Sequence, residues 1–264
     1  MNIVVCIKQV PASTHVKMDP VKHTLIRDKA GATINPYDLH ALESALQIRE
    51  TYGGKVTAIT MGPFQASDVL KKAVGMTVDD CVLVCGREFA GADTLATSYT
   101  LSSAIKKVCP ADLIICGKIA VDGDTAQVGP GMSKWLGMSL VCNVVKIEKI
   151  EDKKIFVKRA IEGGIELVSV NLPAVITVDK SINIPRIESI KGRFRELEFE
   201  PKVVNAEEID CDLTKIGLNG SPTSVAKVFV PERQKAEHEL IEGKNAVEKA
   251  QKVADFLFES KLII

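Results

Sequence analysis

The stretch Gly117-Lys118-Ile119-Ala120-Val121-Asp122-Gly123-Asp124-Thr125-Ala126-Gln127-Val128-Gly129-Pro130-Gly131 follows a short apolar run, residues 112–116. After it, Met132, Trp135 and Leu136 have helical spacing, and Gly137 is typical of a helix end. A buried strand that opens through a glycine-rich turn into a helix can bind phosphate, because unpaired N–H groups and the helix dipole face the anion. An alternative stays open: a tight turn in which the glycines serve only the backbone.

Strand and helix patterns alternate over the first ~140 residues. Short β-branched runs at residues 3–7, 55–60, 81–85 and 113–116 are apolar almost throughout, which is typical of strands buried on both faces. Amphipathic helical patterns lie between them. The alternation predicts an α/β fold with a doubly wound, mostly parallel, Rossmann-like sheet. In such sheets ligands bind beyond the carboxyl ends of the strands.

That rule selects candidate binding residues. Lys8, Met61 and the stretch 117–131 each follow a predicted strand. Asn35-Pro36-Tyr37-Asp38 places Asn at the N-cap and Pro at the first helical position, so that free N–H groups point outward. Asp93 is the expected N-cap of the next helix, which begins near Thr94. For the caps, a purely structural role is equally compatible with the pattern, and a lysine after a strand is more often solvated.

Composition limits the class of protein. The 34 lysines and arginines balance the 34 aspartates and glutamates, so charge gives no argument for binding nucleic acid. No apolar run approaches the roughly 18 residues of a membrane helix, and the first residues lack a basic signal region, so neither membrane insertion nor secretion is expected. Seven cysteines without a Cys-x-x-Cys pair indicate reduced thiols and a cytoplasmic location. Four scattered histidines do not favour a metal site.

The second half has a different pattern. Alternating apolar and polar residues over 144–170 predict an antiparallel meander, and residues 172–178 predict a return to a buried strand. Residues 185–200 carry alternating charge, typical of a solvated linker. Residues 210–232 have little periodicity and are interpreted as an arm lying on another subunit. Residues 244–261 predict a final amphipathic helix. We therefore expect a core of residues 1–200 and an arm with a helix over 201–264.

Two further motifs carry a family resemblance. Val157-Lys158-Arg159-Ala160-Ile161-Glu162-Gly163-Gly164-Ile165-Glu166-Leu167-Val168 and then Leu172-Pro173-Ala174-Val175-Ile176-Thr177 resemble the signature of electron transfer flavoprotein beta subunits. The resemblance extends over essentially the whole chain and includes residues 5–10, 35–38, 60–63 and 122–129.

The resemblance implies a heterodimer with an alpha subunit, contacted by the C-terminal arm and helix, and a beta chain that binds an adenine nucleotide. Ordinary members hold AMP in the beta chain, whereas electron-bifurcating members hold a second FAD there. The family pattern puts nucleotide contacts at Cys6, residues 35–38, Met61 and residues 120–131. Sheet logic and resemblance together give these candidate cofactor-binding residues: Cys6, Lys8, Asn35, Pro36, Tyr37, Asp38, Met61, Asp93, Thr94, Ala120, Val121, Asp122, Gly123, Asp124, Thr125, Ala126, Gln127, Val128, Gly129, Pro130 and Gly131.

The stretch 122–130 is similar to the bifurcating members, whereas mitochondrial-type beta subunits have a bulkier residue in place of Gly123. FAD is therefore expected rather than AMP, with NADH as the electron donor. One electron would go to ferredoxin or flavodoxin. The other would go to the FAD of the alpha subunit and on to a flavin dehydrogenase.

Such a chain is an electron-transfer subunit, not an enzyme by itself, and it needs no catalytic acid or nucleophile. Residues 185–200 resemble the family's recognition loop, in which Ile190 would dock on an acyl-CoA dehydrogenase-type partner. Two alternatives remain: a beta subunit with structural AMP, and an adenine-nucleotide-binding module without redox function.

Overall fold

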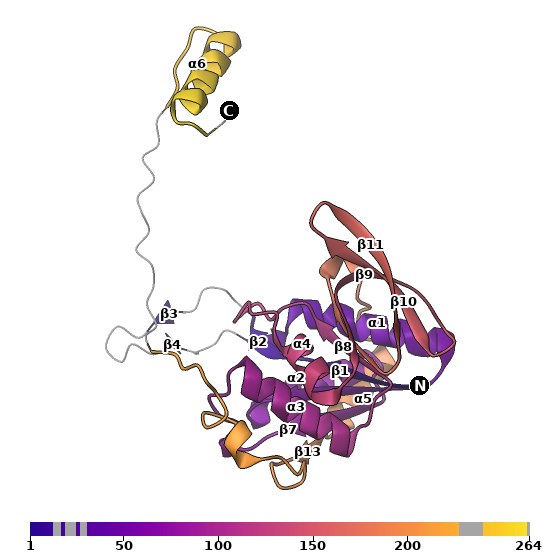
Figure 1. The fold of residues 1–264 in the computed structure, drawn as a ribbon. Coiled ribbons are helices and arrows are strands. Elements are labelled where there is room, and N and C mark those ends of the chain that lie inside the picture. The colour runs from indigo at the N-terminus through magenta and orange to yellow at the C-terminus, as the bar shows by residue number, and fades with distance from the viewer. Residues whose placement is uncertain (13–16, 19–24, 27–30, 227–239, 263–264) are drawn as a thin grey trace. The chain divides into compact units, whose positions relative to one another are not determined.

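A computed structural model describes residues 1–12, 17–18, 25–26, 31–226 and 240–262 of the chain (Figure 1). By its internal packing the chain divides into two units, Met1–Ala226 and Lys227–Ile264. The first unit contains a nine-stranded sheet with helices on both faces, and the described part of the second contains one helix. The predicted fold class is confirmed.

The sheet has the strand order β11-β10-β9-β12-β8-β1-β6-β7-β13. Its parallel part comprises β1 (Asn2–Cys6), β6 (Lys55–Met61), β7 (Asp80–Val84), β8 (Leu113–Gly117), β12 (Ala174–Val178) and β13 (Lys202–Val204). From β1 the chain first builds outward through β6 and β7, and then returns to place β8 on the other side of β1. This reversal of direction makes β1 and β8 the switch point of the sheet, where ligands of doubly wound folds bind.

Helices α1 (Pro36–Tyr52) and α2 (Ser67–Gly75) cover one face of the sheet, and α3 (Thr94–Val108) and α4 (Val128–Leu136) cover the other (Figure 1). Alternate residues of β1 divide between two cores. Ile3 and Val5 pack on the first face, and Val4 packs on the second. Burial on both faces explains why the strand runs are apolar throughout. The helix α4 ends at Gly137, whose φ of 66° is left-handed, as the sequence predicted.

The meander is also confirmed. Strands β9 (Ser139–Glu151), β10 (Lys154–Ile161) and β11 (Gly164–Asn171) pair antiparallel, and β9 joins the parallel part by pairing with β12. The turn between β10 and β11 contains Gly163 at a φ of 82°, a conformation that glycine adopts without strain. Two small sheets accompany the main one: β2 (Gln9–Pro11) with β5 (Ala32–Ile34), and β3 (Lys17–Met18) with β4 (Leu25–Ile26). Four short 3₁₀ turns lie in the described residues: Phe64–Ala66, Arg87–Phe89, Lys180–Ile182 and Leu213–Lys215.

The linker predicted over residues 185–200 is wrong in its second half, where helix α5 (Ile190–Glu198) forms. The Ser189 side chain caps this helix by accepting from the N–H of Gly192. The helix packs on α2 so closely that a Cβ on Gly192 would lie 2.0 Å from the Gly75 carbonyl oxygen. The sequence did not predict this helix, because its charges alternate and its only buried residue is a glycine, so it has no stripe of buried apolar residues.

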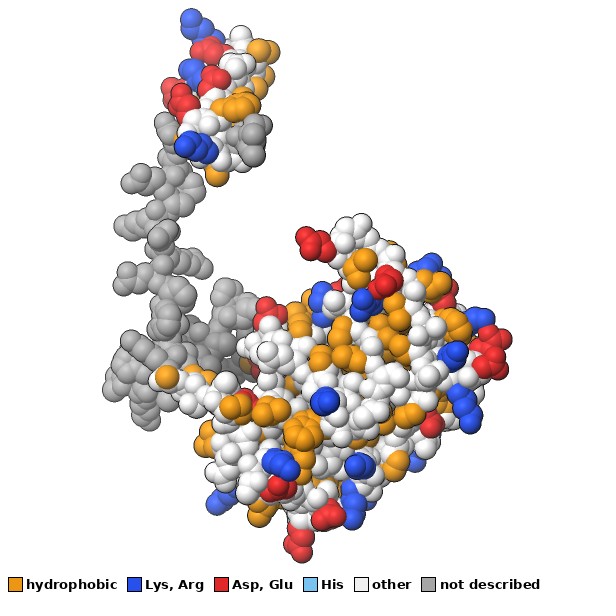
Figure 2. Space-filling view, viewed as in Figure 1, with side chains coloured by type: hydrophobic (Ala, Val, Ile, Leu, Met, Phe, Trp, Pro, Cys, Tyr) orange, Lys and Arg blue, Asp and Glu red, His pale blue; other side chains and the backbone are white. Residues whose placement is uncertain are grey.

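Residues 201–226, which we expected to begin the arm, pack on the first unit by burying Ala206, Ile209 and Ile216 against the α3 side of the sheet. Residues 210–226 belong to the first unit, where Ile216 is buried, and residues 227–232 lie outside the described residues. The interpretation of 210–232 as an arm on another subunit stays a prediction. In the second unit, the predicted amphipathic helix is present as α6 (Ala246–Glu259). Figure 2 shows apolar side chains along one side of this helix and charged ones along the other.

Candidate functional site

The expected cofactor-binding residues gather at the carboxyl ends of β1 and β8. Lys8 follows β1, and its Nζ forms an ion pair with Asp122 at 2.7 Å, across a separation of 114 residues. The Thr94 hydroxyl donates to Gln127 Oε1 at 2.7 Å, which ties the start of α3 to the same stretch. We call the stretch 118–127 the switch loop. The switch loop therefore contacts the residue after β1 and the start of α3, at the carboxyl ends of the strands, where the sheet topology predicts a ligand.

Asn35 occupies the predicted N-cap position of α1, but its side chain does not cap that helix. Its Nδ2 donates to the Ile119 carbonyl oxygen at 2.8 Å, and its Oδ1 accepts from the N–H of Val121 at 3.2 Å. The side chain is almost fully buried, with 1% of its surface exposed. Asn35 therefore holds the first half of the switch loop in place. Local sequence predicts a cap here, because a partner 84 residues away leaves no local signal.

Asp38 is a buried carboxylate that joins the two strand ends. Its Oδ2 accepts from the N–H of Lys8 at 2.8 Å and its Oδ1 accepts from the N–H of Gly117 at 3.2 Å. A side chain at position 117 would not fit, because its Cβ would lie 2.3 Å from Asp38 Oδ1. Burial raises the pKa of Asp38 to about 7, although the side chain of Asn35 and the two N–H donors act in the opposite direction. Asp38 thus fixes the switch point from inside the protein.

The raised pKa gives Asp38 a predictable effect on stability. The ordinary pKa of the group is 3.8, so between about pH 4 and 7 the folded chain binds a proton that the unfolded chain does not. The stabilisation that this proton provides is complete below about pH 4 and is lost as the pH rises through about 7. We therefore expect Asp38→Asn to flatten the stability curve, measured by urea unfolding at pH 5, 6, 7 and 8. Parallel curves for the two proteins would contradict this assignment.

The three glycines that follow Gly117 in the stretch 117–131 have different surroundings. A Cβ on Gly129 would lie 2.6 Å from Thr177 Cγ2, and a Cβ on Gly131 would lie 2.6 Å from Ser98 Oγ. These two glycines allow α4 to pack closely on β12 and α3, so helix packing alone explains why positions 129 and 131 are glycine. Gly123 differs, because nothing lies within 4 Å of a Cβ built there and its φ is not left-handed. The chain itself does not require a glycine at position 123.

At the start of α3, Asp93 is the N-cap, as predicted. Its Oδ1 accepts from the N–H groups of Leu95 and Ala96, and its Oδ2 accepts from the N–H and hydroxyl of Thr223. These hydrogen bonds hold the pKa of Asp93 below its ordinary value, against the opposing effect of desolvation. Asp93 is thus occupied by its own helix and by the segment at Thr223.

Other expected residues lie nearby but point elsewhere. The Cys6 thiol is buried and packs against the Met132 sulfur at 3.8 Å, so only the backbone of Cys6 lies at the carboxyl end of β1 near the switch loop. The Tyr37 ring lies under the Lys180 ammonium, 4.4 Å from the ring centroid. Met61 ends β6, on the far side of β1 from β8. All seven cysteines are free, as predicted, and burial raises the pKa of Cys81 to about 12, which makes that thiol unreactive at neutral pH.

The described geometry fits a phosphate-containing ligand at the switch loop. Residues 121–127 are all exposed, and no side chain caps the amino end of α4. In the first turn of α4, Pro130 has no N–H and the N–H of Gly131 donates to the Gln127 carbonyl oxygen, so the N–H groups of Val128 and Gly129 are the ones that could meet an anion. The helix dipole favours negative charge there. The Lys8 ammonium adds a positive charge at the same place. An open loop between two pinned ends suits a long ligand, such as a nucleotide, that lies across the edge of the sheet.

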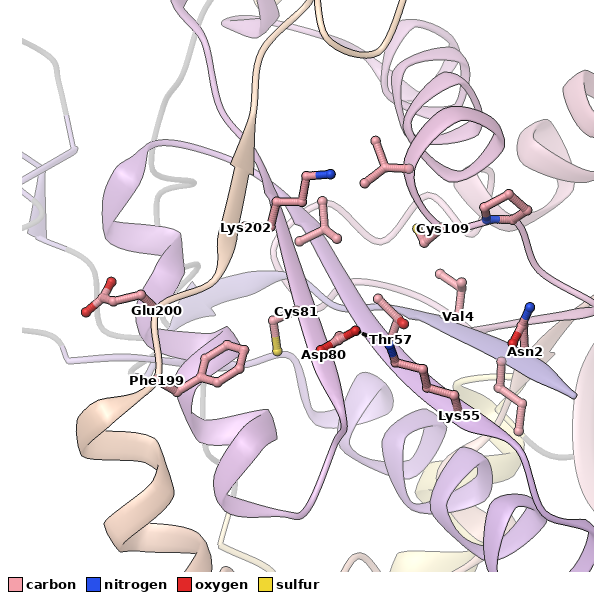
Figure 3. Close-up of a pocket in the computed structure, with 14 residues that line it drawn as sticks. Asn2, Val4, Lys55, Thr57, Asp80, Cys81, Cys109, Phe199, Glu200 and Lys202 are labelled. Atoms are coloured by element: carbon pink, nitrogen blue, oxygen red, sulfur yellow. Dashed lines mark ion pairs between the residues drawn. The ribbon is translucent and has the colours of Figure 1, made fainter.

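A cavity of about 540 Å³ lies at the opposite edge of the sheet and contains none of the expected residues (Figure 3). It is lined by the first residues of β1, β6 and β7, with Phe199 and Lys202 from the chain after α5. The Lys55 and Asp80 side chains point toward one another there as an ion pair. Because ligands of doubly wound sheets bind at the carboxyl edge, we expect the site at the switch loop and not in this cavity.

Two other ligand classes, nucleic acids and metal ions, can be compared with the described part of the chain. On the face shown in Figure 2, basic and acidic side chains are interspersed, and no extended basic patch is visible. The parts of the chain that the structure describes contain no cluster of His, Cys, Asp and Glu suited to a metal ion. Within the same parts, every helix is too short or too polar to span a membrane.

The chain has the fold of a doubly wound α/β protein, with an exposed loop at the switch point of its sheet, and comparison with known proteins identifies the family. Residues 22–206 match the model of the electron transfer flavoprotein domain. The chain is 46% identical to an electron transfer flavoprotein subunit beta of Thermoanaerobacterium thermosaccharolyticum, over 89% of this chain and 90% of the relative. It is 45% identical to the protein FixA of Azotobacter vinelandii, over 92% and 88%. It is 43% identical to the caffeyl-CoA reductase-Etf complex subunit CarD of Acetobacterium woodii, over the full length of both. The chain therefore belongs to the electron transfer flavoprotein beta-subunit family.

Proposed function

We propose that this beta subunit holds FAD at the switch loop and accepts electrons from NADH. The observation that carries the proposal is the open space at Gly123, next to the uncapped amino end of α4. Since the fold does not need a glycine there, a close ligand gives the position its reason. The resemblance of the stretch 122–130 to bifurcating members, and the similarity to CarD, support FAD over AMP.

In this proposal the protein positions and tunes the cofactor. The N–H groups of Val128 and Gly129 at the start of α4 and the Lys8 ammonium bind phosphate, for which Asp122 must give up its ion pair with Lys8. Asn35 and Asp38 keep the two strand ends at a fixed separation. A bound flavin would supply hydride acceptance and single-electron transfer, by which electrons reach ferredoxin or flavodoxin and the alpha subunit. The Thr94–Gln127 pair lies where it could adjust the polarity around such a ring.

Two surfaces support assembly with other proteins. The apolar side of α6, with exposed Val247 and Val253, would pack on the alpha subunit. The second surface lies around α5, where five large apolar side chains are exposed: Ile184, Ile187, Ile190, Phe194 and Leu197. Exposed apolar groups at this density mark protein–protein contacts. We propose that this docking surface, with Ile190 as one anchor, binds a flavin dehydrogenase of the acyl-CoA dehydrogenase type.

Cofactor content tests the proposal directly. Purified heterodimer is expected to contain two FAD per dimer, measured by absorbance and by chromatography of the released nucleotides. NADH titration of that heterodimer should reduce flavin. One FAD together with one AMP would instead establish the non-bifurcating alternative. A preparation without flavin or nucleotide in the beta chain, after reconstitution with excess FAD and AMP, would contradict both.

A further inference from the structure

Arg186 makes an unusually complete set of contacts with helix α1. Its Nε and Nη2 donate to the two carboxylate oxygens of Glu43, at 2.8 and 3.1 Å. Its Nη1 and Nη2 donate to the two oxygens of Glu50, at 2.5 and 3.1 Å, and its backbone N–H donates to Glu43 at 3.1 Å. Glu43 and Glu50 are seven residues apart, so one guanidinium bridges two turns of the same helix face.

This network is stronger than a surface ion pair. The Glu43 side chain is only 5% exposed, and the Gln47 Nε2 also donates to Glu43 Oε1. Burial alone would raise the pKa of Glu43, but the hydrogen bonds from Arg186 hold it below its ordinary value. The fork of donors on a guanidinium can contact both carboxylates at once, which the single ammonium of a lysine cannot do.

The neighbouring residues anchor the same segment. Asn183 Nδ2 donates to the His40 carbonyl oxygen at 3.0 Å and to Ser44 Oγ at 2.9 Å, so a second side chain holds the chain on α1. Beyond it, Ser189 caps α5, and Arg195 donates to the carbonyl oxygens of Val78 and Asp79. Residues 183–195 are thus fixed at both ends.

Between these anchors the apolar side chains point outward. Ile184 is 90% exposed, Ile187 is 92% exposed and Ile190 is 81% exposed. In a loose segment such side chains would turn inward, because burying an isoleucine is favourable. Here the backbone is tied on either side of each, so the side chains stay exposed. A surface held in its binding geometry loses less conformational entropy when it binds.

From these contacts we infer that Arg186 is a positioning residue for partner docking: it holds residues 183–190 on α1 so that the three isoleucines stay presented. The inference rests on the proposed docking function. Arg186 itself is mostly covered by α1 and acts through the placement of the isoleucines. It affects the strength of docking and leaves the rate of electron transfer within the docked complex unchanged.

The test uses the reconstituted heterodimer and a purified acyl-CoA dehydrogenase, with electron transfer followed as a function of dehydrogenase concentration. Arg186→Lys is expected to raise the KM for the dehydrogenase about fivefold and to leave kcat unchanged, since preorganisation is lost without any change in the docked complex. Asn183→Ala removes the neighbouring anchor and is expected to act in the same direction. Arg193→Lys is the matched control, because among the described residues Arg193 forms ion pairs only with Glu188 and Glu196 of its own segment.

A double-mutant cycle with Ile190→Ala separates positioning from general stability. If Arg186 acts through the isoleucines, Arg186→Lys should add little to the KM of the Ile190→Ala variant. Independent, additive effects, or an unchanged KM in Arg186→Lys, would overturn the inference. If Ile190→Ala itself leaves the KM unchanged, the docking proposal fails instead. Should Arg186→Lys not fold, as judged by its thermal unfolding, an unchanged KM in Asn183→Ala would decide against the inference.

Discussion

Gly123→Leu is expected to remove FAD from the beta subunit while leaving its folding intact. Nothing lies within 4 Å of a Cβ at this position, and the backbone there is not left-handed, so the leucine meets no protein atom at its first carbon. We expect a melting temperature of the cofactor-free chain within about 2 °C of wild type, as for other surface substitutions. The added side chain would occupy the space in which we propose that the cofactor lies against this backbone. Flavin content should fall from two per heterodimer to one.

Gly129→Ala provides the contrast for that experiment. Its Cβ would lie 2.6 Å from Thr177, inside the packing of α4 on β12, so the change should lower the melting temperature. Gly123→Leu and Gly129→Ala therefore separate a ligand-facing glycine from a packing glycine. Two flavins in the Gly123→Leu heterodimer would show that Gly123 does not face the cofactor.

The sequence predicted the sheet correctly, because the sheet depends on local patterns, and the proposed site follows from the sheet. Four apolar runs with helices between them determine a parallel sheet, and the sheet determines where strand ends meet. The burial of Asp38 could be predicted from the sequence, because the residue lies three, four and seven residues before Ala41, Leu42 and Ala45, on the buried face of α1. A lone carboxylate on such a face requires partners, but the pattern does not say which.

The rest depends on contacts distant in sequence. Asn35 has the residue type and position of a helix cap, yet its partners are 84 and 86 residues away. Arg186 and Glu43 are 143 residues apart and sit in segments whose charges resemble any solvated surface. The glycines at 123 and 129 are indistinguishable in the sequence, and only the neighbours of their missing Cβ atoms tell them apart.

Asn35→Ala is expected to lower both the stability of the beta subunit and its retention of cofactor. The change leaves the Ile119 carbonyl and the Val121 N–H without their partners beneath the switch loop. Each lost hydrogen bond at a partly buried site costs about 1–2 kcal/mol. Two such bonds cost about 2–4 kcal/mol, and at about 2–4 °C per kcal/mol for a unit of this size the melting temperature should fall by roughly 4–16 °C.

The cofactor effect follows from the same two bonds. Asn35 fixes the loop at Ile119 and Val121, directly before Gly123, so its loss lets the ligand-binding backbone move. Flavin retained after gel filtration should therefore fall well below that of wild type. Asn205→Ala is the matched control, because Asn205 is an exposed asparagine that caps a local turn by accepting from the N–H of Glu208. It should cost less stability and leave flavin content unchanged. If Asn35→Ala loses stability but keeps its flavin, Asn35 supports the fold alone and the switch loop does not need it to bind the cofactor.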